Sequence, residues 1–114
     1  MAVNDKVKQG DRWTLIIDFE DENQAPVDQT GFTFACQWRT SKSSTTVSAQ
    51  ADVDMSQAAA GTVTLTVDGT VTRGLAVRKY EYDIEKWTEE GVDTVTLLDG
   101  YISVEADTTR PVTP

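Results

Sequence analysis

Three carboxylates at alternate positions, Glu81, Asp83 and Glu85, form the pattern in this sequence that comes nearest to catalytic chemistry. Two carboxyl groups that face one cleft hydrolyse a glycosidic bond when the pKa of one of them is raised. Alternation along a single strand is also typical of a solvated face, where charges discourage edge-to-edge pairing between molecules. No nucleophile and base accompany the three residues, so we predict a solvated face and a protein that is not an enzyme.

A second acidic group lies in residues 18–28, where Asp18, Glu20, Asp21 and Glu22 precede Asp28. Closely spaced carboxylate oxygens are ligands for Ca²⁺. An EF-hand loop needs a glycine at its sixth position and a glutamate at its twelfth, and neither is placed correctly here. The segment is rich in Asp, Asn, Pro and Gly, which favours a solvated connecting loop, and we predict no metal and no cofactor. The sequence leaves open whether this loop binds a cation.

The chain contains no histidine and one cysteine, Cys36. The lack of histidine excludes a Ser-His-Asp triad, a Cys-His nucleophile pair and a histidine-ligated zinc or haem. A single cysteine forms no intrachain disulfide and no cysteine-rich metal centre. Cys36 alternates with Phe34 and Trp38, which predicts a buried, apolar thiol rather than a reactive one. Trp13 and Trp38 are predicted to lie in the core for the same reason.

The 114 residues carry 19 Asp and Glu against 10 Lys and Arg, a net charge of −9. An acidic chain repels phosphate backbones and anionic lipid surfaces, so we predict no nucleic-acid partner and no membrane partner. No run approaches the roughly 20 apolar residues that span a bilayer, and residues 1–10 lack the apolar stretch of a secretory signal. We therefore expect the chain to fold in a reducing cytoplasm.

The elements that hold these residues are predicted to be strands. The β-branched residues Thr and Val supply 30 of the 114 residues, whereas Leu occurs five times. Within residues 11–20, Trp13, Leu15 and Ile17 alternate with polar residues, which is the period of a half-buried strand. The same period predicts strands at residues 32–40, 47–53, 62–68, 78–87 and 92–105, and a short one near residues 3–7.

The connections between these strands carry further predictions. Residues 55–61 form one helical turn or a loop, and residues 69–77 form a crossover with a short helical or irregular turn that Leu75 anchors to the core. Residues 88–91 form a hairpin connection that contains a glycine. The adjacent residues Leu97 and Leu98 interrupt the alternation, which predicts a bulge near residues 99–100, Asp-Gly.

About seven strands without a βαβ rhythm predict an all-β fold, an immunoglobulin-like antiparallel β-sandwich. The Cys…Trp…Cys pattern of true immunoglobulin domains is absent, and a small barrel is the alternative. We predict one domain at residues 11–105. An N-terminal arm or short first strand precedes it at residues 1–10, and a C-terminal tail follows at residues 106–114.

Three apolar residues, Ile16, Trp87 and Leu98, fall on the polar sides of their predicted strands. Single exposed apolar residues are common on protein surfaces and need no function. A cluster of them suits a protein partner, and tryptophan is enriched at interface hot spots. These residues are therefore the candidate protein interface if the fold brings them together.

A set of phrases along residues 8–110 carries a family resemblance. The first combines Gly10 and Asp11 with the Pro-Val-Asp-x-Thr-Gly-Phe run of residues 26–32, and the later ones are VTLTV after Gly61, RKYEYDIEKW and LLDGYISVEADTTRP. They resemble small virion structural proteins of tailed bacteriophages, including the N-terminal domain of phage baseplate upper proteins and stand-alone proteins encoded near tail fibres. Two features depart from that layout. Arg78 and Lys79 stand where a glycine usually precedes the paired tyrosines, and GTVTRGLAV replaces the usual short helix.

The resemblance implies an immunoglobulin-like virion structural domain that acts by assembling with other virion proteins. It favours the tail, baseplate or fibre-attachment region, and it implies a virion location after folding in the cytoplasm of a bacterial host. Virion symmetry predicts a symmetric homo-oligomer, a trimer or a higher ring. The sequence leaves two alternatives open, a capsid decoration or cement protein and a carbohydrate-binding module for host-surface recognition.

Overall fold

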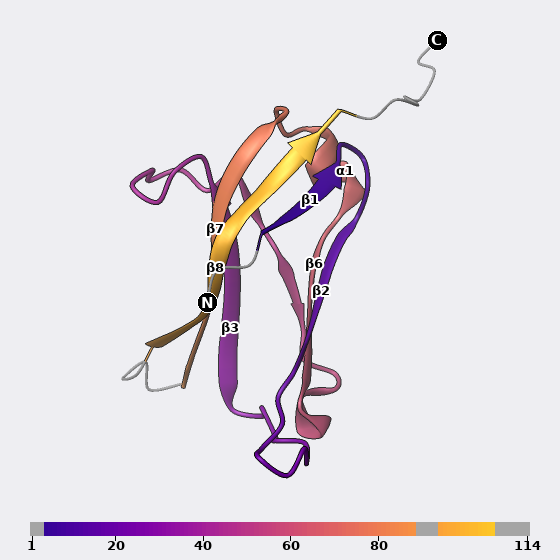
Figure 1. The fold of residues 1–114 in the computed structure, drawn as a ribbon, viewed down its shortest axis with the longest axis vertical. Helices are drawn as coiled ribbons and strands as arrows, with labels where there is room; N and C mark the ends of the chain where they lie inside the picture. Colours follow the sequence, from indigo (N-terminus) through magenta and orange to yellow (C-terminus); the bar gives the residue numbers. More distant parts are fainter. Residues whose placement is uncertain (1–3, 89–93, 107–114) are drawn as a thin grey trace.

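The computed structural model describes residues 4–88 and 94–106, which form two β-sheets that face each other (Figure 1). The larger sheet has the strand order β1-β8-β7-β3-β4, and the smaller has the order β2-β6-β5. The prediction of an all-β, immunoglobulin-like sandwich is confirmed. The elements are β1 (Asp5–Lys8), β2 (Trp13–Asp18), β3 (Phe32–Arg39), β4 (Ala49–Gln50), β5 (Asp52–Asp54), the 3-10 helix η1 (Ala58–Ala60), β6 (Thr62–Val67), the helix α1 (Gly69–Arg73), β7 (Arg78–Thr88) and β8 (Thr94–Glu105).

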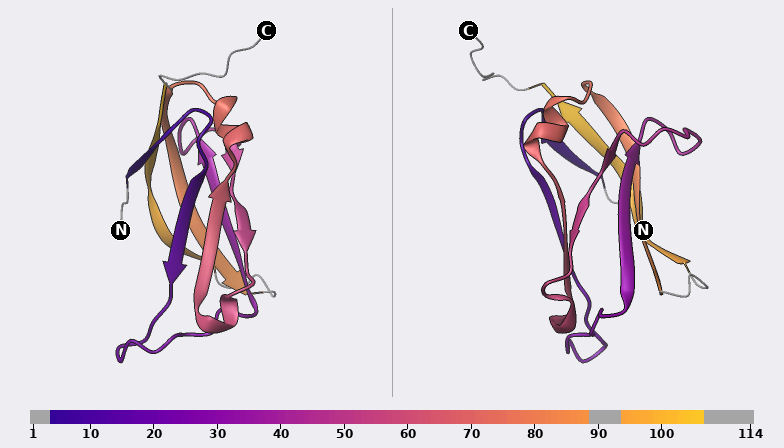
Figure 2. Two further views of the ribbon diagram at one scale, coloured as in Figure 1. Left: turned by 90° about the vertical axis from the view of Figure 1, so that its right-hand side faces the viewer. Right: turned by 180° about the vertical axis from the view of Figure 1, so that it is seen from behind.

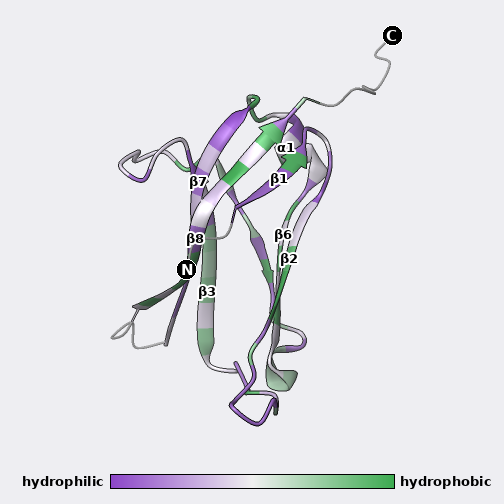
Figure 3. Cartoon of the chain, viewed as in Figure 1, coloured by the Kyte–Doolittle hydropathy of each residue, from purple (hydrophilic) through white to green (hydrophobic). Residues whose placement is uncertain are grey.

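The alternation of apolar and polar side chains gives each sheet one apolar face, which is buried between the two sheets. In β6 the apolar residues Val63, Leu65 and Val67 are buried, and the threonines between them face outward. β2 pairs with β6 in an antiparallel register that places Leu15 opposite Leu65, so the apolar residues of both strands share the inner face. Figure 3 shows apolar positions interspersed with polar ones along β8 of the other sheet.

Aromatic rings join the two sheets. Trp13 of β2 meets Trp38 of β3 edge to face at 5.3 Å between ring centroids, and it meets Tyr82 of β7 at 6.2 Å. The indole N–H of Trp13 also donates to Asp5 Oδ2 over 3.0 Å, which ties β2 to β1. Trp13 and Trp38 are both buried, so the prediction that they lie in the core is confirmed.

The strand predicted at residues 47–53 is wrong in one respect, because it is two strands in different sheets. β4 pairs with β3 in the larger sheet, whereas β5 pairs with β6 in the smaller one. Ala51 lies between them, and its N–H donates to Cys36 O at 2.9 Å. Ala49 and Ala51 are both buried, and their small side chains allow the chain to pass from one sheet to the other at this point.

β1 confirms the short first strand but runs parallel to β8, whereas the sequence predicts an antiparallel sandwich. Its pairing extends from Asp5 opposite Ile102 to Lys8 opposite Glu105. Val7 points inward and is buried. Every other pair of described strands is antiparallel. β1 therefore covers the edge of β8 only over the last residues of that strand.

The bulge in β8 lies at Leu97, earlier than its predicted position near Asp99 and Gly100. β7 and β8 shift register between Ile84 and Glu85, which leaves Leu97 without a partner on β7. An inserted residue of this kind bends the strand and changes which of the following side chains face the core.

The crossover before β7 contains a short helix, α1, which is one of the two forms predicted there, and Leu75 packs against the core as predicted. The expectation that GTVTRGLAV replaces a short helix is wrong, because its first five residues form α1. The buried hydroxyl of Thr72 holds α1 against the turn between β1 and β2. It donates to Asp11 O at 2.7 Å and accepts the N–H of Gly10 at 3.0 Å. A Cβ on Gly69 would collide with Gly10 O, so glycine allows this close approach. α1 thereby fixes the point at which the chain enters β2.

The remaining connections are described in part. Of the two forms predicted for residues 55–61, a helical turn or a loop, the structure has the helical turn, η1, at the opposite end of the sandwich from α1 (Figure 2). The hairpin predicted at residues 88–91 and the tail predicted at residues 106–114 fall mostly outside the described residues. No helix within residues 4–88 and 94–106 is long and apolar enough to cross a membrane.

Candidate interaction surfaces

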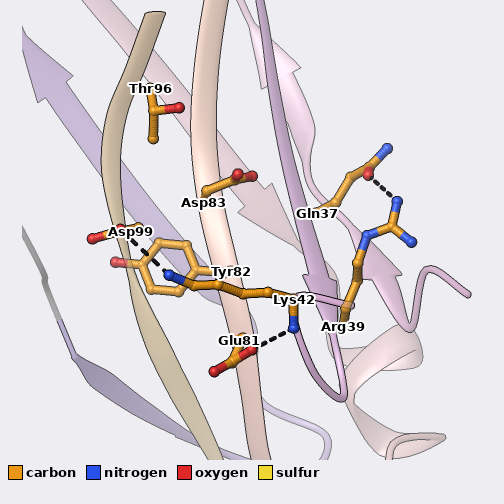
Figure 4. Close-up of a pocket in the computed structure, with 8 residues that line it drawn as sticks. All are labelled: Gln37, Arg39, Lys42, Glu81, Tyr82, Asp83, Thr96 and Asp99. Carbon is orange, nitrogen blue, oxygen red and sulfur yellow. Dashed lines mark hydrogen bonds and ion pairs between the residues drawn. The ribbon is translucent and has the colours of Figure 1, made fainter. Parts of the chain in front are cut away.

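The outer face of the larger sheet carries a polar groove of about 300 Å³ over β3, β7 and β8 (Figure 4). Lys42, from the loop after β3, links two of its carboxylates. The Nζ of Lys42 lies 3.7 Å from Asp99 Oδ2, and its backbone N–H donates to Glu81. The negative charge of the groove is therefore partly neutralised by Lys42, which itself lines the groove. It is lined by Gln37, Arg39, Lys42, Glu81, Tyr82, Asp83, Thr96 and Asp99.

Arg39 is fixed in this groove by two hydrogen bonds. Its Nη2 donates to Gln37 Oε1 at 2.8 Å, and its Nη1 donates to Ser44 O at 2.9 Å. A guanidinium held in this way keeps its orientation, because each bond constrains the planar donor group. The wall of the groove along β3 is accordingly shaped by hydrogen bonds rather than by packing.

A second groove of about 370 Å³ continues along the outer face and contains Trp87. Trp87 stands opposite Thr33 of β3 and is half-buried, so it lies on the polar side of β7 as predicted. This arrangement places one aromatic ring beside polar side chains on an open sheet face. The second groove is lined by Ala35, Gln37, Arg39, Asp83, Glu85 and Trp87.

The alternating carboxylates of β7 face outward. Glu81, Asp83 and Glu85 stand opposite Arg39, Gln37 and Ala35 of β3, all on the outer side of the sheet. They form a row along one strand, and they do not face each other across a closed cleft. This geometry agrees with the solvated face predicted from the sequence.

The acidic loop after β2 uses its carboxylates to order its own backbone. Asp21 Oδ1 accepts the N–H groups of Asn23 and Ala25 at 2.8 and 3.0 Å. Hydrogen bonds from the side chain and backbone of Thr30 lower the pKa of Asp28. These are the local turns that aspartate favours in loops. Within the part of the chain that the structure describes, no three Cys, Asp or Glu residues are grouped to hold a metal ion.

Cys36 is fully buried, and burial raises the pKa of its thiol to about 12. Burial likewise raises the pKa of Tyr82 to about 12. A thiol that stays protonated is a poor nucleophile, since the thiolate is the reactive species. Cys36 therefore acts as a small apolar residue, as its alternation with Phe34 and Trp38 predicts.

Ile16 of β2 is 60% exposed, more than any other large apolar residue that the structure describes. The N–H of Phe19 donates to Gly61 O at 2.8 Å, which extends the ladder between β2 and β6 by one residue. Hydrogen-bonded pairs alternate in an antiparallel ladder. The main-chain groups of Thr14, Ile16 and Asp18 therefore point away from β6. Since β2 is an edge strand, they point away from the sheet.

The three predicted interface residues do not share one surface. Ile16 lies on the smaller sheet, and Trp87 lies on the outer face of the larger one. Leu98 stands opposite Ile84 and packs against the core, so its placement on the polar side is wrong. The bulge at Leu97 is the physical reason, because the inserted residue reverses the alternation between the two parts of β8.

One charged residue, Lys86, lies on the inner face and carries no signal of function in the sequence. Its Nζ lies 4.7 Å from the ring centroid of Phe19 and 4.2 Å from that of Phe32, and it donates to Gln29 Oε1 at 3.2 Å. Burial lowers the pKa of Lys86. The alternation places Lys86 on the same face as Ile84, so strand parity is the one feature that predicts its position.

The fold and its surfaces define a two-sheet, immunoglobulin-like sandwich. No family model and no curated protein matches the chain. Among solved structures, the chain is similar to the N-terminal domain of phage TP901-1 ORF48, with 16% sequence identity and a TM-score of 0.52. The alignment covers 88% of this chain and 82% of that one. At this identity the likeness is one of fold.

Two further solved structures have lower TM-scores. A family 123 glycoside hydrolase from Clostridium perfringens matches with 13% identity and a TM-score of 0.42, over 92% of this chain and 23% of the hydrolase chain. The PKD domain from KIAA 1837 protein matches with 13% identity and a TM-score of 0.35, over 96% of this chain and 87% of that one. Neither likeness carries an argument about function.

Proposed function

We propose that this chain is a non-enzymatic structural protein of a tailed-phage virion, in the tail, baseplate or fibre-attachment region. The observation that carries the proposal is the two-sheet fold, which the N-terminal domain of phage TP901-1 ORF48 shares over 88% of this chain. The ordered phrases along residues 8–110 support it independently, because they resemble the sequences of small phage virion proteins. The protein reaches the virion after folding in the cytoplasm of the bacterial host.

The architecture suits a protein that works by assembly with other virion proteins. The edge-to-face contact of the buried rings of Trp13 and Trp38 joins the two sheets into one packed body. The contacts of such a protein come from strand edges and exposed faces. Here these are the β2 edge with Ile16 and the outer-face groove with Trp87.

The test is the copy number of the protein in purified virions, measured by quantitative mass spectrometry against the major capsid protein. A handful to a few dozen copies supports the tail, baseplate or fibre-attachment region. Hundreds of copies would make the protein a capsid decoration or cement protein instead. Absence from the virion would overturn the structural role altogether.

A carbohydrate-binding module for host-surface recognition is the second candidate, and Trp87 is the observation that favours it. An aromatic ring beside amide and carboxylate side chains offers a stacking platform and hydrogen-bonding groups for a sugar. A glycan array with the purified protein tests it. Binding that is lost in Trp87→Ala and kept in Val77→Ala supports the candidate, and no binding to any glycan removes it.

A further inference from the structure

The smaller sheet ends in an open edge of unusual composition. β2 is bonded to β6 on one side, and the main-chain groups of Thr14, Ile16 and Asp18 point away on the other. No hydrogen bond from another described segment reaches these groups. The strand is free of charge from Trp13 to Ile17, and Ile16 is 60% exposed. Natural proteins usually protect such an edge with charges, proline or a covering loop.

We propose that this edge pairs with the same edge of a second copy, as antiparallel strands across a twofold axis, with Ile16 opposite the partner's Ile16. The pairing would join two three-stranded sheets into one continuous sheet. A contact of this kind is isologous, because each copy contributes the same surface.

The register follows from which residues have open main-chain groups. With Ile16 at the axis, Thr14 stands opposite the partner's Asp18, and Asp18 stands opposite the partner's Thr14. In this register, each residue whose main-chain groups point away from β6 stands opposite a residue of the same kind in the partner. Each such pair can therefore form two N–H to O hydrogen bonds. A shift by one residue would place edge-facing groups opposite groups already bonded to β6, which prevents pairing.

The side chains agree with the same register. On the outer face Ile16 packs against the partner's Ile16, which covers the most exposed large apolar residue of the described chain. On the inner face Leu15 stands opposite the partner's Ile17, and both residues are only half-buried in the single chain. Direct cross-strand apolar pairs of this kind stabilise sheets.

Charge also favours a second copy at this edge. Two copies that each carry a net charge of −9 repel, so they meet most easily through an uncharged strip such as residues 13–17. Beyond the strip, Arg12 falls opposite the partner's Glu20, which pairs opposite charges at both ends of the contact. Arg12 is exposed and forms an ion pair with Asp68 at 3.8 Å, so its side chain lies at the surface where a partner's carboxylate can reach it.

The other edges are less suited to the same pairing. β4 and β5 have two and three residues, and β1 has four. The part of β8 beyond β1 is interrupted by the bulge at Leu97, which breaks the regular spacing of main-chain groups. β2, with six residues and no irregularity in its register with β6, is the longest regular edge among the described strands.

The first test measures association of the purified full chain by sedimentation, from micromolar to millimolar concentration. We expect a monomer–dimer equilibrium in the wild type that Ile16→Lys weakens at least about 10-fold, because two like charges would meet at the axis. The matched control is Val77→Lys, at a residue 55% exposed and outside β2, which leaves the equilibrium unchanged. A strictly monomeric wild type, or equal weakening by both variants, overturns the proposal.

The second test fixes the register by cross-linking. Opposite residues of a hydrogen-bonded antiparallel pair have Cα atoms about 5.5 Å apart, within the range that a disulfide spans. Ile16→Cys should therefore form a covalent dimer under mild oxidation far faster than Val77→Cys. The native Cys36 is buried and does not contribute. Equal rates for the two variants would exclude Ile16 from the axis and overturn the register.

This inference goes beyond the proposed function, because two copies can pair through β2 without any virion. A monomer that is nonetheless present in purified virions would overturn the inference and leave the proposed function intact. A dimer through Ile16 that is absent from virions would support the inference and overturn the proposed function. The two failures are thus distinguishable.

Discussion

β6 and β2 are neighbours in one sheet, have six residues each and follow the same alternation of apolar and polar residues. They differ in position, because β6 lies in the middle of the sheet and β2 lies at its edge. β6 is bonded on both sides, to β2 and to β5, and Leu65 has no exposed surface. β2 is bonded on one side only, and Leu15 is half-buried. The outward residues differ as well, since β6 presents threonines where β2 presents Ile16.

The difference shows that a side-chain pattern and a burial level have separate causes. Alternation determines which face of a strand turns inward. How deeply a residue is buried depends on the number of strands beside its own and on what packs across the sandwich. The buried interior around β6 and the open edge of β2 should therefore respond differently to substitution and to pH in solution.

The largest effect on stability is expected from shortening a buried side chain in β6. Leu65→Ala should lower the free energy of unfolding by about 3 kcal/mol, because a fully buried leucine leaves a cavity. Leu15→Ala should cost about 1 kcal/mol, since part of that side chain is already in water. Urea unfolding followed by tryptophan fluorescence at low protein concentration measures both. Equal losses would show that the β2 edge is as closed as β6.

A somewhat smaller effect is expected at the turn that leads into β2. Thr72→Val keeps the shape of the side chain but leaves Asp11 O and the N–H of Gly10 without their hydroxyl partner. We expect a loss of about 2 kcal/mol in the free energy of unfolding. Thr64→Val, on the outer face of β6, is the control and should change stability by less than about 0.5 kcal/mol. Similar losses in the two variants would argue against the anchoring role of Thr72.

Alkaline pH should weaken the closed interior through Cys36. The pKa of this thiol is about 12 in the folded chain against an ordinary value of 9.0. Below pH 9.0 the thiol is protonated in both states, and above it only the unfolded chain ionises, so stability falls as pH rises toward 12. At about pH 10 the loss due to Cys36 should be on the order of 1 kcal/mol. Cys36→Ala should flatten that part of the pH profile, and an unchanged slope would contradict the assignment.

The smallest effect on stability is expected at the open edge. Ile16→Thr should change the free energy of unfolding of the monomer by less than about 0.5 kcal/mol, because the side chain is mostly in water. The same change should weaken self-association, since it removes apolar surface from the proposed contact. Sedimentation and urea unfolding on one preparation separate the two effects. A large loss of monomer stability would mean that Ile16 supports the fold itself.

The differences between the predictions from sequence and the observed structure have local physical reasons. The alternation of apolar residues in β2, β3, β6 and β7 predicted these strands and the inward side chains of Trp13 and Trp38. It failed at Leu98, because a single inserted residue at Leu97 reverses the alternation and has no signature beyond two adjacent leucines. It also treated residues 47–53 as one strand, because the change of sheet at Ala51 leaves the alternation intact.

The candidate surfaces were predicted less completely than the fold. Ile16 and Trp87 were recognisable as apolar residues on polar sides, and the structure places both outward. Their separation onto two sheets was not recognisable, because strand order depends on pairings between segments far apart in the chain. Strand parity alone predicts the inward position of Lys86, whereas its charge favours the solvent-exposed face.

The residue order alone is enough to predict an acidic, all-β chain, the inward-facing residues of most strands and the burial of Cys36. Those properties depend on local alternation and composition, which are written directly in the residue order. Three other properties emerge only in the folded chain: β1 runs parallel to β8, the outer face carries a groove that contains Trp87, and β2 is an edge strand. An edge is defined by the strand that is missing beside it, and no local pattern in the sequence records which neighbours a strand will lack.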